Sequence, residues 1–186
     1  ASVSAIKGGK IIDTSMGFTP LEGLVMGTRT GDIDPAAVLF LMKEKGMSIA
    51  ETDDYLNKQS GLLGVSGLSN DFRDIEGAMD EGHERAQLAY DMFALRVKKY
   101  IGAYIAELNG FDAIAFTAGI GENDDRIRAS VCENMENLGL AIDLDKNRGC
   151  RKQAEITAEG AKVRAFIVPT NEELAIAQET LEALGK

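Results

Sequence analysis

The spacing of apolar residues predicts a long amphipathic helix in the middle of the chain. From Glu84 onward, apolar side chains recur at steps of three and four residues until Gly110, and this spacing places them on one face of a helix. Glycine just after the last apolar position commonly ends a helix. We therefore expect a helix over 84–108. His83, the only histidine, precedes it, and we interpret it as a surface residue at the helix start.

Capping signals predict two shorter helices upstream. Asp34 is followed by a proline, so a helix should begin there and run to about Lys45. Ser48 and Glu51 have the spacing of a capping box, which predicts a second helix as far as about Gln59.

Short β-prone runs open the chain and recur in its second half. The runs 2–6 and 11–14 flank two glycines between lysines, a pattern that predicts a hairpin. Compact apolar runs at 113–116 and 163–168 predict two further strands. The glycine-rich segment 60–69 is interpreted as a loop with a short strand.

A turn and then a helical pattern follow each of the two later strands. The glycine turn 117–121 leads into an apolar stripe over 127–138, and the turn 169–173 leads into a predicted helix over 174–184. Strands that alternate with helices indicate an α/β fold with a mixed sheet flanked by helices. In such sheets ligands bind beyond the carboxyl ends of the strands, so both turns are candidate sites.

Composition narrows the class of protein. A chain of 186 residues with 45% hydrophobic and 27% charged residues is expected to fold, as one domain by length. Thirty acidic against twenty basic residues give a net charge of -10, which opposes binding to nucleic acid. There is no apolar run of membrane-spanning length and no signal-peptide pattern, and two cysteines form no disulfide framework. We therefore expect a cytoplasmic protein without a membrane or nucleic-acid partner.

The glycine turn after the third strand is the first candidate for ligand binding. Glycines between a strand and a helix allow the backbone to approach a ligand, and exposed amides there favour an anion such as a nucleotide phosphate. The turn does not complete a dinucleotide-binding fingerprint or a P-loop. From spacing alone, a tight structural turn is the better interpretation.

Arg29 is the second candidate, between two glycines and just before a capped helix. A guanidinium held on a loop can grip a phosphoryl or carboxylate group and stabilise its charge. The alternative is that Arg29 pairs with Asp32 or Asp34 to brace a turn.

Two more segments carry candidate chemistry. The segment 71–74 offers an aromatic ring, a cation and carboxylates in a predicted loop, which suits a purine and its ribose, although Phe72 could equally anchor a core. Thr170 and Glu173 have the spacing of a capping box, which leaves Glu172 as a candidate ligand for Mg²⁺ through water. Together, the four features are what a Mg-nucleotide phosphotransferase site contains.

These segments resemble the acetate kinase family. Residues 13–35 are similar to the family's signature, and 116–123 and 169–173 follow in the same order. The resemblance implies a ribonuclease H-like domain of the actin, sugar-kinase and chaperone-ATPase superfamily. It also implies the reversible, Mg²⁺-dependent reaction of ATP and acetate to ADP and acetyl phosphate.

The resemblance assigns roles to individual residues. Arg29 would contact acetate and the transferring phosphoryl group as the catalytic residue, and Glu172 would orient Mg²⁺. The nucleotide, ATP or ADP, would be bound by Asp71, Phe72, Arg73, Gly119, Ile120 and Asn123.

Family members are about twice as long, so residues 1–186 are expected to be the C-terminal, nucleotide-binding domain without its N-terminal partner. The absent half would supply a second arginine, an aspartate, histidines and another asparagine, so we expect the isolated chain to be inactive. Propionate or butyrate could replace acetate, and the phosphoryl donor is open. The alternative from another class is a non-catalytic module that binds nucleotide or self-associates, because family members form homodimers through this half.

Overall fold

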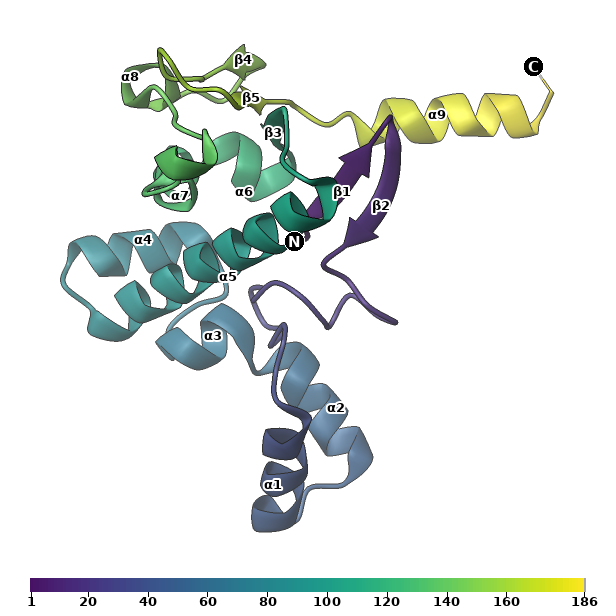
Figure 1. Cartoon of the computed structure of the whole chain (residues 1–186). Helices are drawn as coiled ribbons and strands as arrows, with labels where there is room; N and C mark the ends of the chain where they lie inside the picture. The colour runs from purple at the N-terminus through teal and green to yellow at the C-terminus, as the bar shows by residue number, and fades with distance from the viewer. Residues whose placement is uncertain (186) are drawn as a thin grey trace. The chain divides into compact units, whose positions relative to one another are not determined.

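The computed structural model describes residues 1–185, which divide into two compact units with a boundary after Gly110. Figure 1 labels the helices and strands. The first unit comprises β1 (Ser4–Lys7), β2 (Lys10–Thr14), α1 (Pro35–Lys45), α2 (Ile49–Lys58), α3 (Gly61–Ser66), α4 (Phe72–Asp80) and α5 (Glu84–Leu108). The second comprises β3 (Ala113–Phe116), α6 (Ala118–Asn123), α7 (Asp125–Cys132), the 3-10 turn η1 (Glu136–Leu138), α8 (Leu144–Asn147), β4 (Ala154–Glu155), β5 (Arg164–Ile167) and α9 (Glu172–Ala183).

Local signals in the first unit act as the sequence predicts. The strands β1 and β2 form an antiparallel hairpin. The Asp34 side chain accepts from the amide of Ala36 and caps α1, and Ser48 and Glu51 form the capping box of α2. The predicted hairpin and both helices are thus confirmed.

Segment 60–69 was expected to be a loop and instead contains α3. Three glycines argue against a helix there, but the amides at the start of α3 donate to carbonyl oxygens of residues 26 and 27. Tertiary hydrogen bonds therefore replace the missing local propensity.

Helix α5 provides half of the buried hydrophobic side chains of the first unit. It is confirmed over the whole predicted range, and it contacts both α3 and α4. His83 is its N-cap, with a side chain that accepts from the amide of Ala86, as the surface interpretation predicts. The buried hydrophobic side chains of α3, α4 and α5 are Leu62, Phe72, Ile75, Ala86, Ala89, Tyr90, Phe93, Ala94, Ile101 and Tyr104.

The second unit contains a three-stranded mixed sheet in the order β3-β5-β4. Strands β3 and β5 are parallel, and β4 is antiparallel to β5. The mixed α/β class is confirmed, but the N-terminal hairpin forms a separate two-stranded sheet. Buried hydrophobic side chains here are Phe116, Ile127, Val131, Cys132, Met135, Leu140, Ile156, Val163, Ala165 and Ile167.

The apolar stripe over 127–138 does not form one helix. Helix α7 ends at Cys132, and Asn134 then adopts a left-handed backbone with φ of 59° before η1 begins. Asparagine tolerates this conformation better than most residues, so the break has a local cause. Within residues 1–185, no helix combines the length and apolar character needed to cross a membrane.

Candidate functional site

Arg29 lies at the end of a tight turn in the first unit. The amide of Met26 donates to the carbonyl oxygen of Arg29 at 3.1 Å, which closes the turn. The turn is docked onto the start of α3, where the amides of Leu62 and Leu63 donate to the carbonyl oxygens of Met26 and Gly27 at 2.9 Å each. The backbone that carries Arg29 is therefore anchored, while the residue itself is exposed.

Gly61 permits the close approach of α3 to this turn. A Cβ at Gly61 would lie 2.1 Å from the carbonyl oxygen of Met26 and 2.7 Å from that of Arg29. Gly61 also has a φ of +62°, a conformation that glycine adopts at no steric cost. Only glycine fits this position without displacing the Arg29 turn.

The structure decides between the two interpretations of Arg29. The Asp32 carboxylate pairs with Arg96 at 3.0 Å and accepts hydrogen bonds from the Tyr100 hydroxyl, and Asp34 caps α1. Within residues 1–185 we find no ion pair to Arg29. The turn-bracing interpretation is therefore wrong, and the guanidinium is available to a ligand.

The segment that begins at Asp71 forms the start of α4, so the predicted loop is wrong. Asp71 is the N-cap, and its Oδ1 accepts from the amide of Arg73 at 2.9 Å and from its Nε at 3.0 Å. The hydrogen bonds from this guanidinium lower the pKa of Asp71 from 3.8 to about 2. Aspartate is a preferred N-cap residue, so the sequence held a helix signal that the loop-like residues before it masked.

Phe72 belongs to the hydrophobic core. Its ring is only 8% exposed and lies 4.8 Å from the ring of Phe93 and 5.9 Å from that of Tyr90, edge to face. A purine could not stack on this ring unless it left the core, so the core-anchor alternative is correct. Its neighbours Asp71 and Arg73 keep their polar atoms accessible to solvent.

The Arg29 turn and the Asp71 segment lie side by side in the first unit. A Cβ at Gly27 would lie 2.9 Å from the carbonyl oxygen of Asn70, the residue just before Asp71. Two of the predicted site segments are thus brought together, and the contact requires a glycine in the Arg29 turn.

In the second unit, Glu122 joins the turns that follow two neighbouring strands. Because β3 and β5 are parallel, their carboxyl ends lie at one edge of the sheet. Oε1 of Glu122 accepts from the amides of Ala118 and Thr170 at 2.7 Å each, and from the Thr170 hydroxyl at 3.0 Å. The hydrogen bond from the Thr170 amide is the main cause of the lowered pKa of Glu122. Sequence reasoning missed Glu122 because its partner Thr170 lies 48 residues further along the chain.

The glycine turn leads into α6, which contains three of the predicted nucleotide residues, Gly119, Ile120 and Asn123. The side-chain amide of Asn123 donates to the carbonyl oxygen of Gly119 at 2.8 Å. Apart from its chain neighbours and the backbone of α6 itself, no atom lies within 4 Å of the position a Cβ would take at Gly119, so the backbone there is open to a ligand. Ala118 has a φ of 58°, which is unusual for a residue with a side chain.

Glu172 lies in the first turn of α9 with Glu173, and both residues are exposed. The predicted capping box is wrong, because Asn171 caps the helix by accepting from the amide of Leu174 at 3.0 Å. Thr170 instead donates to Glu122. The cap therefore gives no reason to prefer one glutamate over the other as a metal ligand, and only the family resemblance singles out Glu172.

Few acidic groups are close enough to form a protein-only metal site. In the described part of the chain there is no group of three or more histidine, cysteine or acidic residues that could hold a metal ion. Mg²⁺ commonly takes one or two carboxylates and fills its other positions with water and substrate phosphates. A single exposed carboxylate at Glu172 fits that mode of binding.

Arg128 is a buried residue that sequence reasoning also missed. It is 0% exposed. Its Nη1 donates to the carbonyl oxygens of Gly121 and Glu122 at 2.9 Å, so it binds the carboxyl end of α6. Its Nε donates to Oδ1 of Asn147 at 2.7 Å, and Nη2 donates to the carbonyl oxygens of Asn147 and Cys150 at 3.3 and 2.8 Å. An arginine within an apolar stripe looks like a surface residue, so the sequence offered no signal for this role.

Comparison with known proteins accounts for the order of these segments. The sequence model of the acetokinase family matches residues 1–178. The chain belongs to the acetokinase family. It is 59% identical over 184 residues to the acetate kinase of Heliobacterium modesticaldum and 57% identical over 181 residues to that of Acetivibrio thermocellus. The alignments cover 99% and 97% of this chain but 46% and 45% of the relatives, so the chain spans about half the length of the curated relatives it matches.

Solved structures of relatives also match nearly all of this chain over about half of their own length. The acetate kinase of Porphyromonas gingivalis matches 98% of this chain with a TM-score of 0.94 and 48% identity, and 46% of that protein is covered. A propionate kinase from Francisella tularensis matches 96% with a TM-score of 0.89 and 44% identity, and 45% of it is covered. The predicted family resemblance is confirmed, and the fold is the mixed α/β fold of part of an acetate kinase.

Proposed function

We propose that this chain is the C-terminal, nucleotide-binding half of a cytoplasmic acetate kinase that transfers the γ-phosphoryl group of ATP to acetate. Family membership and coverage of about half of each relative support the kinase assignment. The family resemblance supports the finer description as a ribonuclease H-like domain. The observation that carries the nucleotide assignment is the joining of two strand-end turns through Glu122.

The α6 turn is the proposed phosphate contact. Gly119 leaves open space where other residues have a Cβ, so a phosphate can approach the backbone of Gly119 and Ile120. Asn123 braces this turn through the carbonyl oxygen of Gly119. Glu172 would hold Mg²⁺, which neutralises charge on the transferring phosphoryl group when it is bound.

Arg29 is the proposed catalytic residue. Its exposed guanidinium is free of carboxylate partners within residues 1–185, and the turn beneath it is fixed by hydrogen bonds to α3. A planar fork of this kind can bind the acetate carboxylate and the equatorial phosphoryl oxygens together. An acetate oxygen attacks the γ-phosphorus, the bond to the β-phosphate oxygen breaks, and ADP leaves.

Asp71 and Arg73 are the proposed polar contacts to the adenosine. Both offer exposed polar atoms at the start of α4, and their mutual pairing fixes the position of the guanidinium. Phe72 supports this position from the core by packing on Phe93. We therefore assign its ring an indirect contribution rather than a stacking contact.

The isolated chain should not catalyse the reaction, because phosphoryl transfer depends on positioning and exclusion of water, and the chain spans about half the length of its relatives. Joined to the remaining half of a family member, it should form acetyl phosphate. Trapping acetyl phosphate with hydroxylamine tests both statements, and turnover by the 186-residue chain alone would contradict the first.

Substitution of Arg29 tests the catalytic assignment in that complete enzyme. Arg29→Ala should lower kcat by about two to three orders of magnitude, the usual cost of losing a preorganised transition-state donor. Arg29→Lys should recover little, since a point charge does not reproduce a planar fork. Arg164→Lys, an exposed residue paired with Glu155, is the matched control. Normal turnover in Arg29→Ala would remove the assignment.

A second substrate is favoured by one observation, the similarity to a propionate kinase of Francisella tularensis at 44% identity. One methylene changes binding by only about 1–3 kcal/mol, so acetate and propionate can be close competitors. The ratio of kcat/KM for acetate, propionate and butyrate in the complete enzyme distinguishes them. The complete enzyme is also expected to be a homodimer, which sedimentation at micromolar concentration tests.

A further inference from the structure

The loop that carries Arg29 is closed at its base by a pair of residues, Gly23 and Asp32. The amide of Asp32 donates to the carbonyl oxygen of Gly23 at 3.0 Å, and the amide of Gly23 donates to Oδ1 of Asp32 at 2.8 Å. Gly31 fits beside this pair only as glycine, because its Cβ would lie 2.5 Å from the carbonyl oxygen of Gly23. The two ends of the loop, at Gly23 and Asp32, are therefore held next to each other.

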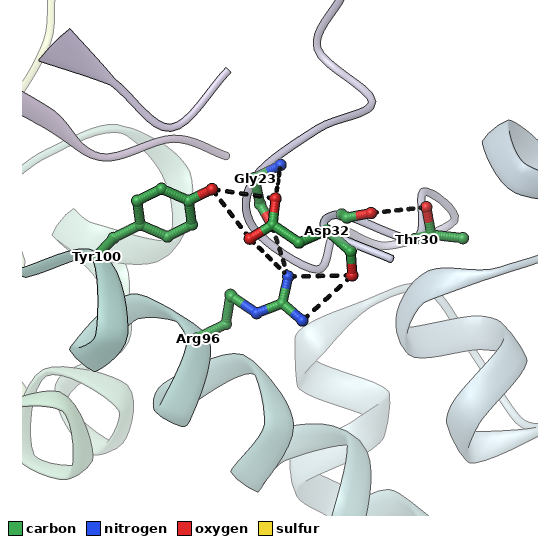
Figure 2. A network of polar contacts seen from close by, with 6 residues as sticks. Gly23, Thr30, Asp32, Arg96 and Tyr100 are labelled. Carbon is green, nitrogen blue, oxygen red and sulfur yellow. Dashed lines mark hydrogen bonds and ion pairs between the residues drawn. The ribbon is translucent and has the colours of Figure 1, made fainter. Parts of the chain in front are cut away.

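Two side chains of α5 hold this base, as Figure 2 shows. The Tyr100 hydroxyl lies 3.0 Å from Oδ1 and 2.9 Å from Oδ2 of Asp32. Arg96 pairs with Oδ2 of Asp32 at 3.0 Å, and its Nη1 also donates to the carbonyl oxygen of Gly23 at 3.0 Å. Because Arg96 and Tyr100 are four residues apart, they lie on one face of the helix and grip the base of the loop together.

These contacts link distant parts of the sequence to the proposed catalytic residue. Arg96 and Tyr100 lie 64 and 68 residues after Asp32. The tip of the same loop is docked separately, because the amide of Thr30 donates to the carbonyl oxygen of Leu56 at 3.1 Å. Because the base and the tip of the loop are both fixed, the direction in which the chain presents Arg29 is set by α5 as well as by α2 and α3.

We propose that Asp32, Arg96 and Tyr100 are positioning residues for phosphoryl transfer, which act by holding the loop that presents Arg29. The inference rests on the proposed function. The Asp32 carboxylate is about two-fifths exposed, and ion pairs exposed to this degree add little to stability. The network is therefore better suited to fixing the direction of the Arg29 loop than to holding the unit folded. Displacement of a catalytic group by about 1 Å can lower the rate about 100-fold.

The test uses the complete enzyme, with this chain joined to the remaining half of a family member. Tyr100→Phe removes the hydroxyl and keeps the ring, and Asp32→Asn removes the charge and keeps the shape. Each should lower kcat by about 10-fold or more, with the KM for the nucleotide unchanged within about 2-fold. Glu155→Gln, which removes an exposed ion pair with Arg164 in the second unit, is the control and should leave both constants unchanged.

Combination with Arg29→Ala separates positioning from general destabilisation. If Tyr100 acts through Arg29, Tyr100→Phe should cost almost nothing further in the Arg29→Ala background. Because residues that act as a unit are non-additive, this coupling is the expected result. Equal losses in both backgrounds, or a nucleotide KM that rises together with the fall in kcat, would overturn the inference. So would unchanged kcat in Tyr100→Phe and Asp32→Asn.

Loss of the proposed function and loss of the positioning role give different results in these assays. A complete wild-type enzyme that forms no acetyl phosphate would contradict the proposed function. An active wild-type enzyme that is indifferent to Tyr100→Phe and Asp32→Asn would contradict only the positioning role. A folded Tyr100→Phe variant, verified by its melting temperature, keeps the test valid if Asp32→Asn fails to fold.

Discussion

Replacement of Arg128 by methionine should destabilise the second unit and loosen its α6 turn. Methionine has a similar length and fills the buried space, but it donates no hydrogen bond. The change removes five hydrogen bonds, to the carbonyl oxygens of Gly121, Glu122 and Cys150 and to the side-chain and backbone carbonyl oxygens of Asn147. The end of α6 would lose the two hydrogen bonds that anchor it to Arg128 of α7.

The size of the effect follows from the number of lost partners. A hydrogen bond of this kind contributes a net of about 1 kcal/mol, so the loss of all five suggests a cost of about 5 kcal/mol. Burial of the Arg128 cation carries a desolvation cost and lowers the pKa of its guanidinium, so removing the cation returns part of the lost free energy. We expect the free energy of unfolding of this unit to fall by about 3–4 kcal/mol.

Hydrogen exchange is the assay that resolves this unit. The chain has no tryptophan, and its four tyrosines lie at positions 55, 90, 100 and 104, so intrinsic fluorescence reports on the first unit alone. Exchange of the α6 and α7 amides should accelerate by about two orders of magnitude or more, at tenfold per 1.4 kcal/mol. Arg164→Met, at an exposed pair with Glu155, should change little. Equal exchange in both variants would refute the reasoning.

Three further predictions concern the first unit. Gly61→Ala should lower the free energy of unfolding by at least about 1–2 kcal/mol, because alanine is strained in the left-handed backbone conformation of Gly61. It should also lower kcat of the complete enzyme, because the new Cβ displaces the Arg29 turn. Urea unfolding and turnover measurements check the two effects. Asp71→Asn should remove a loss of stability that the wild type shows in acid. Because Arg73 lowers the pKa of Asp71, this carboxylate adds stability above its ordinary pKa of 3.8, and that stability is lost as the pH falls through about 2. An unchanged acid-unfolding profile in the variant would count against this prediction. Burial and the Asp32 hydrogen bond raise the pKa of Tyr100 to about 12, so its stabilising effect persists below pH 10 and is lost as the pH rises through about 12. Absorbance titration should show this ionisation shifting to lower pH in Asp32→Asn.

Much of the fold could be predicted because its signals are local. The apolar spacing that predicts α5 continues over about seven helical turns, and the capping residues Asp34 and Ser48 accept hydrogen bonds from neighbouring amides. Helix α3 could not be predicted, since its first amides bind carbonyl oxygens more than 30 residues away. The break after Cys132 depends on the left-handed conformation of one asparagine, which periodicity does not encode.

Some residues of the candidate site could likewise be predicted from local sequence signals, and others could not. Arg29 stands out in the sequence because glycines flank it, and Gly119 because it lies with Gly121 in a turn after a strand; the structure leaves both accessible. Phe72 was ambiguous, since an aromatic residue near charges suits either a core or a ligand, and its packing against Phe93 decides for the core. Glu122 acts through contacts between distant segments, so no local pattern points to it.

Calorimetric titration of the 186-residue chain with ADP, with and without Mg²⁺, tests the central claim most directly. Substitution of Phe72 would disturb the core, so the variant to use is Gly119→Asp, which places a negative charge in open space at the proposed phosphate contact. Gly102→Asp is the matched control, at a helical glycine of α5 that also has open space around its Cβ position. The account predicts saturable one-site binding that Gly119→Asp weakens by about 10-fold or more, at about 1.4 kcal/mol, and that Gly102→Asp leaves unchanged. No binding to the folded chain, or equal weakening by the two substitutions, would contradict it.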